Sequence, residues 1–193
     1  MAVEEPTAAC GLDLASVRRE PSDGAEQVTQ LLLGEPVTVH ERRAGWARIE
    51  TAYAYPGWVR EEALGEPVEG EWPIRREGDV LAEARAYLGA PYEWGGMSER
   101  GIDCSGLIHM AFRRLGILVP RDSWQQEAAG VEVTASDLRP GDIACYEGHT
   151  AFWTGEGRIL HAYGVEGVKQ VVEEPEPADL AARRRKFRRF SPT

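Results

Sequence analysis

The chain divides into two regions with different patterns of hydrophobic and polar positions. Four short apolar-alternating segments in the first region are separated by turn residues, at 27–33, 36–41, 46–51 and 57–64. Short strands at such spacing are typical of a small β-barrel. Prolines, glycines and charges replace this pattern over residues 66–78. We therefore predict a small β-domain over residues 1–70, a linker over 71–77 and a second domain over 78–193.

The second region begins with helical patterns and continues with strand patterns. Apolar residues at helical spacing fill 78–89 and 104–116, and 121–130 predicts a further short helix; the stretch 90–103 between the first two is a glycine-rich loop. Strand patterns then follow at 143–146, 150–154, 158–163 and 168–173, and the segment 178–187 is expected to be helical or frayed. Helices followed by a run of strands indicate an α+β domain.

One motif carries candidate chemistry. In Asp103-Cys104-Ser105-Gly106, a cysteine follows a residue of the helix-capping type and opens the apolar helix pattern. The first backbone N–H groups of a helix and the positive end of its dipole lower the pKa of a nearby thiol. We therefore expect Cys104 to be a reactive, nucleophilic cysteine.

Two histidines supply a candidate base. His149 and His161 lie in apolar strand patterns on either side of a Gly-Glu-Gly turn signal, which is typical of a β-hairpin. Folding about residues 155 and 156 would place the two histidines opposite each other or one position apart. A nucleophile, a base and an orienting group for the base would then all be present.

Composition and charge narrow the classes of function. The 22 basic and 32 acidic residues give a formal net charge of −10, which argues against general nucleic-acid binding and against adhesion to anionic membranes. The first residues resemble neither a signal peptide nor a transmembrane helix. The three cysteines at irregular spacing suit a reducing compartment. We expect a soluble cytoplasmic protein that is a monomer.

Six short motifs follow one another in order, namely PYEWGG, DCSG, RDSWQQ, LRPGD, GHTAFW and ILHA. This series resembles the NlpC/P60 cysteine peptidases, and the first seventy residues look like a bacterial SH3-type domain with its GWV strand. The resemblance covers nearly the whole chain. It implies a papain-like α+β catalytic domain preceded by a small SH3-like β-barrel. It also implies cleavage of the amide between the γ-carboxyl of D-glutamate and a diamino acid in bacterial wall peptides.

The resemblance assigns roles to four residues. Cys104 is implied as the nucleophile, His149 as the general base and acid, and His161 as the residue that orients His149. Tyr92 is similar in place to a tyrosine near the family's nucleophile, and could donate to the developing oxyanion together with the Cys104 N–H. This chemistry needs no cofactor and no metal.

Members with an N-terminal SH3-type domain and a cytoplasmic appearance act as dipeptidyl peptidases on peptides with a free N-terminal L-alanine. By this comparison Asp103 would pair with the substrate ammonium group. Tyr55 and Glu26 of the first domain would supply the remaining ammonium contacts, with Glu20 as the competing assignment for Glu26. The further substrate contacts implied are Ser105, Ser123 and Trp94.

Structural roles compete with several of these assignments. Asp103 and Ser123 are good helix caps, and Trp94 and Tyr55 could be core aromatics. Cys104 could be a buried structural thiol. A zinc site built from Cys145, His149 and His161 is the alternative to the catalytic set, although the usual paired ligand spacing is missing.

Two further features are expected to be structural. His40 and His109 are interpreted as satisfied, partly buried histidines. The basic run at 183–189 is interpreted as a solvated face that balances the acidic segment before it, rather than as a ligand-binding patch.

We therefore expect a cysteine peptidase that removes L-Ala-γ-D-Glu from the following diamino acid of murein peptides during cell-wall peptide recycling. One rival is a secreted wall endopeptidase or an amidase of related fold, which would accept polymeric or N-blocked chains. Another rival is a wall-fragment sensor or adaptor that binds without turnover.

Overall fold

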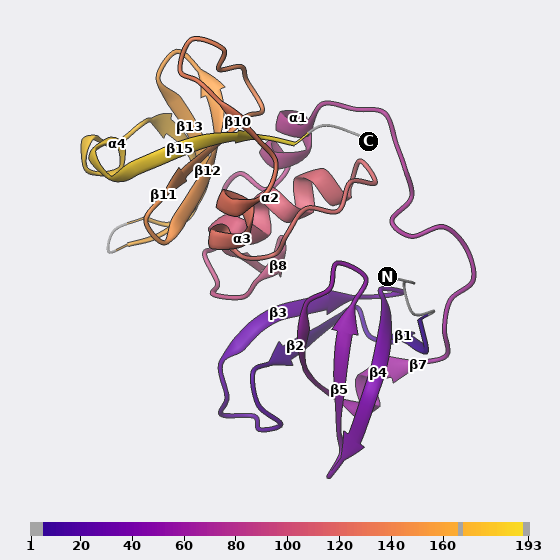
Figure 1. Cartoon of the computed structure of the whole chain (residues 1–193). Helices are drawn as coiled ribbons and strands as arrows, with labels where there is room; N and C mark the ends of the chain where they lie inside the picture. Colours follow the sequence, from indigo (N-terminus) through magenta and orange to yellow (C-terminus); the bar gives the residue numbers. More distant parts are fainter. Residues whose placement is uncertain (1–5, 166–167, 191–193) are drawn as a thin grey trace. The chain divides into compact units, whose positions relative to one another are not determined.

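The computed structural model describes residues 6–165 and 168–190, and the chain divides into two compact units, Met1–Trp72 and Pro73–Thr193 (Figure 1). Each unit contains a β-sheet of its own, and helices occur in the second unit.

The first unit is an antiparallel sheet of seven strands in the order β3-β2-β6-β5-β4-β1-β7. Its elements are β1 (Ala8–Cys10), β2 (Leu14–Arg18), β3 (Gln27–Leu32), β4 (Pro36–Arg43), β5 (Trp46–Thr51), β6 (Pro56–Arg60), the 3₁₀ turn η1 (Glu61–Ala63) and β7 (Leu64–Gly65).

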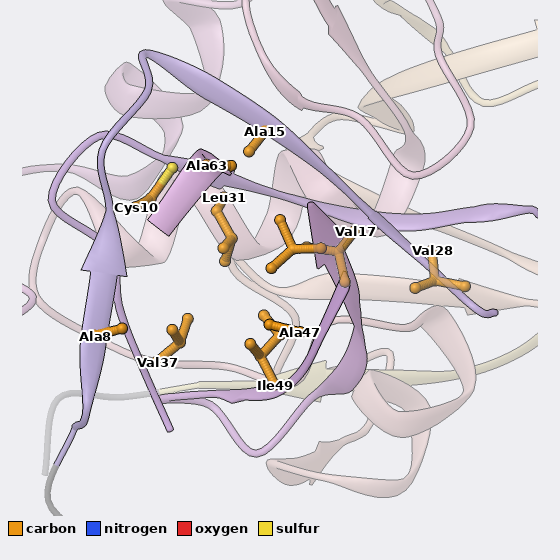
Figure 2. Close-up of a cluster of buried hydrophobic side chains, with 11 residues drawn as sticks. Ala8, Cys10, Ala15, Val17, Val28, Leu31, Val37, Ala47, Ile49 and Ala63 are labelled. Carbon is orange, nitrogen blue, oxygen red and sulfur yellow. The ribbon is translucent and has the colours of Figure 1, made fainter. Parts of the chain in front are cut away.

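An apolar core fills the inside of this sheet (Figure 2). The buried side chains come from every strand except β7, and are Ala8, Cys10, Ala15, Val17, Val28, Leu31, Val37, Ala47, Ile49 and Val59, with Ala63 from η1. Gly57 of the GWV segment crosses Val17 so closely that a Cβ there would lie 2.3 Å from a Val17 methyl carbon. A larger residue at 57 would therefore push the two strands apart.

The second unit is built on an antiparallel sheet of six strands in the order β10-β15-β11-β12-β13-β14, with a separate two-stranded hairpin. The strands are β10 (Val131–Val133), β11 (Ile143–Tyr146), β12 (His149–Gly155), β13 (Arg158–Val165), β14 (Val168–Pro175) and β15 (Arg184–Arg189), and the hairpin is β8 (Met97–Ser98) with β9 (Gly101–Ile102). The helices are α1 (Val80–Arg85), α2 (Cys104–Arg113), α3 (Ser123–Ala128) and α4 (Ala178–Arg183).

Helix α2 is the central helix of this unit. All ten of its residues are buried, and it packs against β12 and β13 as well as against α1 and α3. Figure 1 shows α1, α2 and α3 gathered together beside the large sheet. The predicted α+β class, with an SH3-like first part, is confirmed. Within residues 6–165 and 168–190, no helix is long and apolar enough to cross a lipid bilayer.

The segment 178–187 differs from its predicted helical or frayed state. It forms α4 and then enters β15, a strand that lies between β10 and β11 in the sheet. Its buried Phe187 contributes to the core under this sheet. The arginines of β15 pair with acidic groups elsewhere in the unit, such as Arg189 with Asp142 at 2.6 Å and Arg188 with Glu132 at 3.3 Å. These pairs balance the charges of the basic strand, which the sequence was interpreted to present as a solvated face.

Candidate active site

Cys104 is the first residue of α2 and is 8% exposed. The preceding Asp103 is the N-cap, and its Oδ1 accepts a hydrogen bond from the Gly106 N–H at 2.7 Å. The helix can start here only because residue 106 has no side chain, since a Cβ would lie 2.4 Å from the Gly96 carbonyl oxygen. The DCSG motif thus fixes the thiol at a helix N-terminus against the glycine-rich loop.

The surroundings of the thiol nevertheless disfavour its ionised form. Burial raises the pKa of Cys104 to about 12, and the negative charge of Asp103 adds to the effect. The N–H groups of Thr150 and Ser105 and the positive charge of Arg121 oppose it without reversing it. The expectation that the helix N-terminus would lower the pKa of Cys104 is therefore wrong, because desolvation outweighs the favourable N–H groups. A base has to remove the proton when Cys104 reacts.

Asp103 is held in a buried ion pair that the sequence alone did not reveal. Arg121, 1% exposed, donates from Nη1 to Oδ1 and from Nη2 to Oδ2, each at 2.9 Å. Oδ2 also accepts from the Gly95 N–H at 2.8 Å, and Oδ1 from the Ser105 hydroxyl at 3.3 Å. Arg121 belongs to the RDSWQQ motif, so its position in a motif was the available signal.

The two histidines meet across the β12–β13 hairpin. Nε2 of His149 lies 2.9 Å from Nδ1 of His161, and both rings are buried. The turn residues are Glu156 and Gly157, with φ of 51° and 73°. The turn is thus displaced by one residue from the predicted centre at 155 and 156. The strands pair with Phe152 opposite Leu160, and the histidines make their contact along a diagonal of this ladder.

The histidine pair continues to a carboxylate. Nε2 of His161 lies 3.0 Å from Oε1 of Glu174 on β14. Glu174 was not predicted, since it lies in an acidic segment where nothing local distinguishes it from its neighbours. Tyr163 stacks on His161 with a ring-centroid distance of 4.9 Å. The three side chains His149, His161 and Glu174 form one continuous hydrogen-bonded series.

Burial sets the protonation state of the pair. It lowers the pKa of His149 to about 3, assisted by His161 and by the charge of Arg183. Burial also lowers the pKa of His161, against the opposite effect of Glu174. Both imidazoles are therefore neutral near pH 7, which is the form in which a histidine accepts a proton.

Tyr92 lies close to the thiol. Its pKa is raised by burial and by its neighbours Cys104 and Asp103, so the phenol keeps its proton and remains a donor. Its ring rests on Gly164 of β13, where a Cβ would lie 2.6 Å from a ring carbon. The Tyr92 N–H bonds to the Lys169 carbonyl at 2.8 Å. Gly164 was not singled out from sequence, because its requirement comes from this long-range contact.

The other predicted contacts have varied environments. Ser105 is buried, and its hydroxyl accepts from Arg121 at 3.0 Å. Ser123 begins α3 but does not cap it, because Asp122 and Gln125 form the capping box. Trp94 is 61% exposed and is not a core aromatic.

The predicted contacts from the first unit lie in two different settings. Tyr55 is half-buried and packs against the core of that unit. Glu26 and its competitor Glu20 are both exposed. Glu26 pairs with Arg19 at 2.6 Å.

The two remaining histidines differ from each other. His109 is fully buried, and its Nδ1 contacts the Val119 carbonyl oxygen at 2.7 Å. His40 is exposed on β4, so the expectation that it is partly buried is wrong.

The zinc alternative finds no geometric support in the described part of the chain, where no three histidine, cysteine or acidic residues form a group that could hold a metal. The sheet register explains why. Cys145 pairs with Thr150 and Tyr146 pairs with His149, so Cys145 and His149 face opposite sides of the sheet.

A buried thiol at the start of a helix and a pair of hydrogen-bonded imidazoles on a sheet are the residue types that cysteine hydrolases use. Residues 89–182 match the model of the NlpC/P60 family, and residues 17–64 match that of the bacterial dipeptidyl-peptidase SH3 domain. The chain therefore contains a match to the NlpC/P60 family behind a match to a bacterial SH3 domain, as the motifs predicted.

Individual relatives agree with this assignment. The chain is 29% identical to dipeptidyl-peptidase 6 of Lysinibacillus sphaericus over 79% of its length and 59% of the relative. It is 31% identical to the γ-D-glutamyl-L-lysine dipeptidyl-peptidase of Bacillus cereus over 54% of its length and 34% of the relative. A crystal structure of an NlpC/P60 family protein from Bacillus cereus shares the fold, with a TM-score of 0.58, 23% identity and coverage of 97% of this chain and 64% of that one.

The curated relatives are longer than the matched region. The chain spans between 24% and 59% of the length of the first of them. Others, from Mycobacterium and Corynebacterium, are named probable endopeptidases. The names of the relatives thus agree on peptidase activity and differ in the type of cleavage.

Proposed function

We propose that this protein is a cysteine peptidase that cleaves the γ-D-Glu–diamino acid amide of murein peptides with a free N-terminal L-alanine. The observation that carries the proposal is the contact between His149 and His161 at 2.9 Å, beside a thiol that the Thr150 N–H also contacts. Because Thr150 directly follows His149, this N–H brings the sulfur to the same end of β12 as the base.

In the proposed reaction His149 removes the proton from Cys104 as the sulfur attacks the amide carbonyl. Neutral His149 has a lone pair that can accept this proton, and the N–H groups of Thr150 and Ser105 stabilise the sulfur as it becomes negative. The imidazolium then gives its proton to the leaving amine, which produces a thioester on Cys104. Water, deprotonated by His149, hydrolyses the thioester and restores the thiol.

The tetrahedral intermediates carry a negative oxygen that needs donors. We assign this role to the Cys104 backbone N–H and the Tyr92 hydroxyl. Tyr92 suits the role because its raised pKa keeps the phenol protonated beside the thiol. A donor directed at the developing oxyanion contributes roughly 10²–10³-fold to the rate of acyl transfer.

The choice of murein peptide as substrate is supported by the relatives. The names dipeptidyl-peptidase and γ-D-glutamyl-L-lysine dipeptidyl-peptidase belong to proteins that match 79% and 54% of this chain. We propose that Ser123 and Trp94 contact the peptide, and that Tyr55 and Glu26 contact the free amino group. Lysine and diaminopimelate both remain in the proposed substrate class.

For Asp103 the structure favours a role in holding the helix start over the substrate-ammonium contact that was expected from the sequence. Its two oxygens already accept from five donor groups, counting both guanidinium N–H groups, and a carboxylate offers about four lone-pair sites. Contact with a substrate ammonium would require one of these donors to leave. We therefore propose that Asp103 mainly holds the start of α2, and that ammonium binding is its secondary role.

The proposal is tested by mass spectrometry of L-Ala-γ-D-Glu-diaminopimelate and L-Ala-γ-D-Glu-L-Lys incubated with the wild type and with Cys104→Ala. N-acetylated forms of both peptides form the second arm. Cleavage of the free peptides by the wild type alone supports the proposal. Equal cleavage of the acetylated peptides would favour an endopeptidase, the second candidate, which the names of other relatives support. Binding without turnover would favour the adaptor.

The biological setting is part of the same proposal. We place the reaction in the cytoplasm, where peptides released from the wall are recycled and carry free amino termini. Fractionation of cells with an antibody against the protein tests this placement. Its recovery from the culture medium or the wall fraction would contradict it.

A further inference from the structure

Glu174 lies where the sheet register brings it to His161. In the β13–β14 pairing His161 stands opposite Val172, and Leu160 stands opposite Glu173. Side chains alternate between the two faces of a sheet, so Glu174 shares a face with His161, whereas Glu173 points to the other face. There Glu173 forms a pair with Arg85 at 2.8 Å. Two adjacent glutamates thus have separate partners.

We infer that Glu174 sets the direction of the hydrogen bonds along the series Glu174–His161–His149 and thereby selects the tautomer of His149 that can act as a base. This inference rests on the proposed function of His149 as a general base. Glu174 itself touches no reacting atom and is a positioning residue.

The argument follows from donor and acceptor counts. A carboxylate only accepts hydrogen bonds, so the contact at 3.0 Å requires the proton of His161 to be on Nε2. A neutral imidazole carries one N–H, which leaves Nδ1 of His161 as an acceptor. The contact at 2.9 Å then requires the proton of His149 to be on Nε2. Nδ1 of His149 therefore keeps its lone pair, which is what a base for Cys104 needs.

If the hydrogen bond between residue 174 and His161 ran in the opposite direction, the bond between His161 and His149 would be reversed as well. If residue 174 donated a hydrogen bond, His161 would carry its proton on Nδ1 and donate to Nε2 of His149. His149 would then hold its own proton on Nδ1 and could not accept one there. An incorrect tautomer of the catalytic histidine is severely damaging in the serine-protease triad, where the residue that orients the base has the same task.

The surroundings leave Glu174 as the group that selects the direction. Tyr163 and Tyr146 pack against His149 by ring contacts, with centroid distances of 5.4 and 5.8 Å, and the Tyr146 hydroxyl donates to Glu176. The charge of Arg183 acts on His149 without a hydrogen bond to it among the described contacts. Burial keeps both imidazoles neutral, as the series requires.

The test compares Glu174→Lys, Glu174→Gln and the matched control Glu173→Lys. Glu174 is 35% exposed on its side chain, so a lysine can be accommodated without burying its charge. We expect Glu174→Lys to lower kcat by about 10- to 100-fold, by analogy with residues that orient a metal-binding histidine through its second nitrogen. KM should stay within about twofold, because the lost contribution arises in the chemical step. Glu174→Gln should lose less, since its carbonyl can still accept. Glu173→Lys should retain kcat.

The second readout is the tautomer of each histidine, measured by ¹H–¹⁵N correlation spectra of histidine-labelled protein. We expect protonated Nε2 on both His149 and His161 in the wild type, and protonated Nδ1 in Glu174→Lys. Unchanged tautomers, or an unchanged kcat in a folded Glu174→Lys variant, would overturn the inference.

The two readouts separate this inference from the proposed function. Full activity of Cys104→Ala would refute the cysteine peptidase and still leave the tautomers to be read. Normal thiol-dependent hydrolysis with protonated Nδ1 on His149 in the wild type would refute only the role of Glu174.

Discussion

His109 and His149 are both buried in the second unit, and burial lowers the pKa of each to about 3. Their partners differ. Nδ1 of His109 contacts a backbone carbonyl, the Val119 oxygen, whereas His149 contacts the side chain of a second histidine that continues to Glu174. His109 is also five residues along α2 from Cys104, on a different face of the helix.

The comparison teaches that a strongly lowered pKa does not identify a catalytic histidine. Desolvation produces the same shift in a histidine that anchors the 117–120 loop and in one that is placed to accept a proton. The distinction lies in the chain of partners and in the nitrogen that this chain leaves available. Arg121 lies near both His109 and the catalytic cysteine candidate, since its positive charge lowers the pKa of His109 and of Cys104.

The largest expected difference is in turnover. His149→Ala should reduce kcat by a factor on the order of 10⁴ or more, as expected when the base of a nucleophile–base unit is removed. His109→Asn should keep kcat within about twofold, because its amide nitrogen occupies the place of Nδ1 and can still donate to the Val119 carbonyl. Steady-state kinetics on the free tripeptide measure both. Similar losses in two folded variants would mean that the comparison misassigns His109.

The next largest effect is expected from breaking the buried ion pair between Arg121 and Asp103. Arg121→Met should lower the free energy of unfolding by about 3–5 kcal/mol, because it leaves the charge of Asp103 buried and unpaired. Urea denaturation measures this loss. The double variant Asp103→Asn with Arg121→Met should be less destabilised than the sum of the single variants, since no unpaired charge remains. Strict additivity would contradict an energetic coupling between the two side chains.

Variants of Tyr92 test the proposed donor to the oxyanion, which has no counterpart around His109. Tyr92→Phe removes the hydroxyl and leaves the ring on Gly164, so kcat should fall by about 10²-fold while KM changes little. Gly164→Ala should displace the ring and give a comparable loss, with the hydroxyl still present. Wild-type kcat in Tyr92→Phe would leave the oxyanion to the backbone N–H alone.

The smallest expected effect is a pH dependence of stability that both histidines share. The folded protein keeps His109 and His149 neutral down to about pH 3, whereas the unfolded chain protonates them near 6.5. Stability is therefore complete above pH 6.5 and decreases as the pH falls, by about 2 kcal/mol per histidine between pH 7 and pH 5. Denaturant titrations of His109→Asn at pH 7 and pH 5 should show a loss in the free energy of unfolding that is smaller than in the wild type by about 2 kcal/mol. A loss equal to that of the wild type would contradict the lowered pKa of His109.

The sequence predicted the features that depend on short-range pattern. Alternation along 27–33 and 46–51 predicted strands, and the DCSG motif predicted the helix that begins at Cys104. The family resemblance and the α+β class were confirmed. The assignment of catalytic and substrate-binding roles stays a prediction until the variants above are measured.

Features that depend on distant partners could not be predicted. The strand β15 looks like a solvated basic run because the acids that pair with it, Asp142 and Glu132 among them, are remote in sequence. Glu174 and Glu173 are indistinguishable until the β13–β14 register assigns them to opposite faces. The raised pKa of Cys104 depends on how deeply the first turn of α2 is buried, which no local motif reports.

The burial of Cys104 also bears on how the protein withstands oxidants. Peroxide attacks the thiolate, and a cysteine whose pKa is raised to about 12 holds almost none of it at neutral pH. The sulfur would become nucleophilic only in the moment when an imidazole accepts its proton in front of a bound carbonyl. The raised pKa of Cys104 therefore predicts that peroxide oxidises this sulfur more slowly than a cysteine that is ionised at rest.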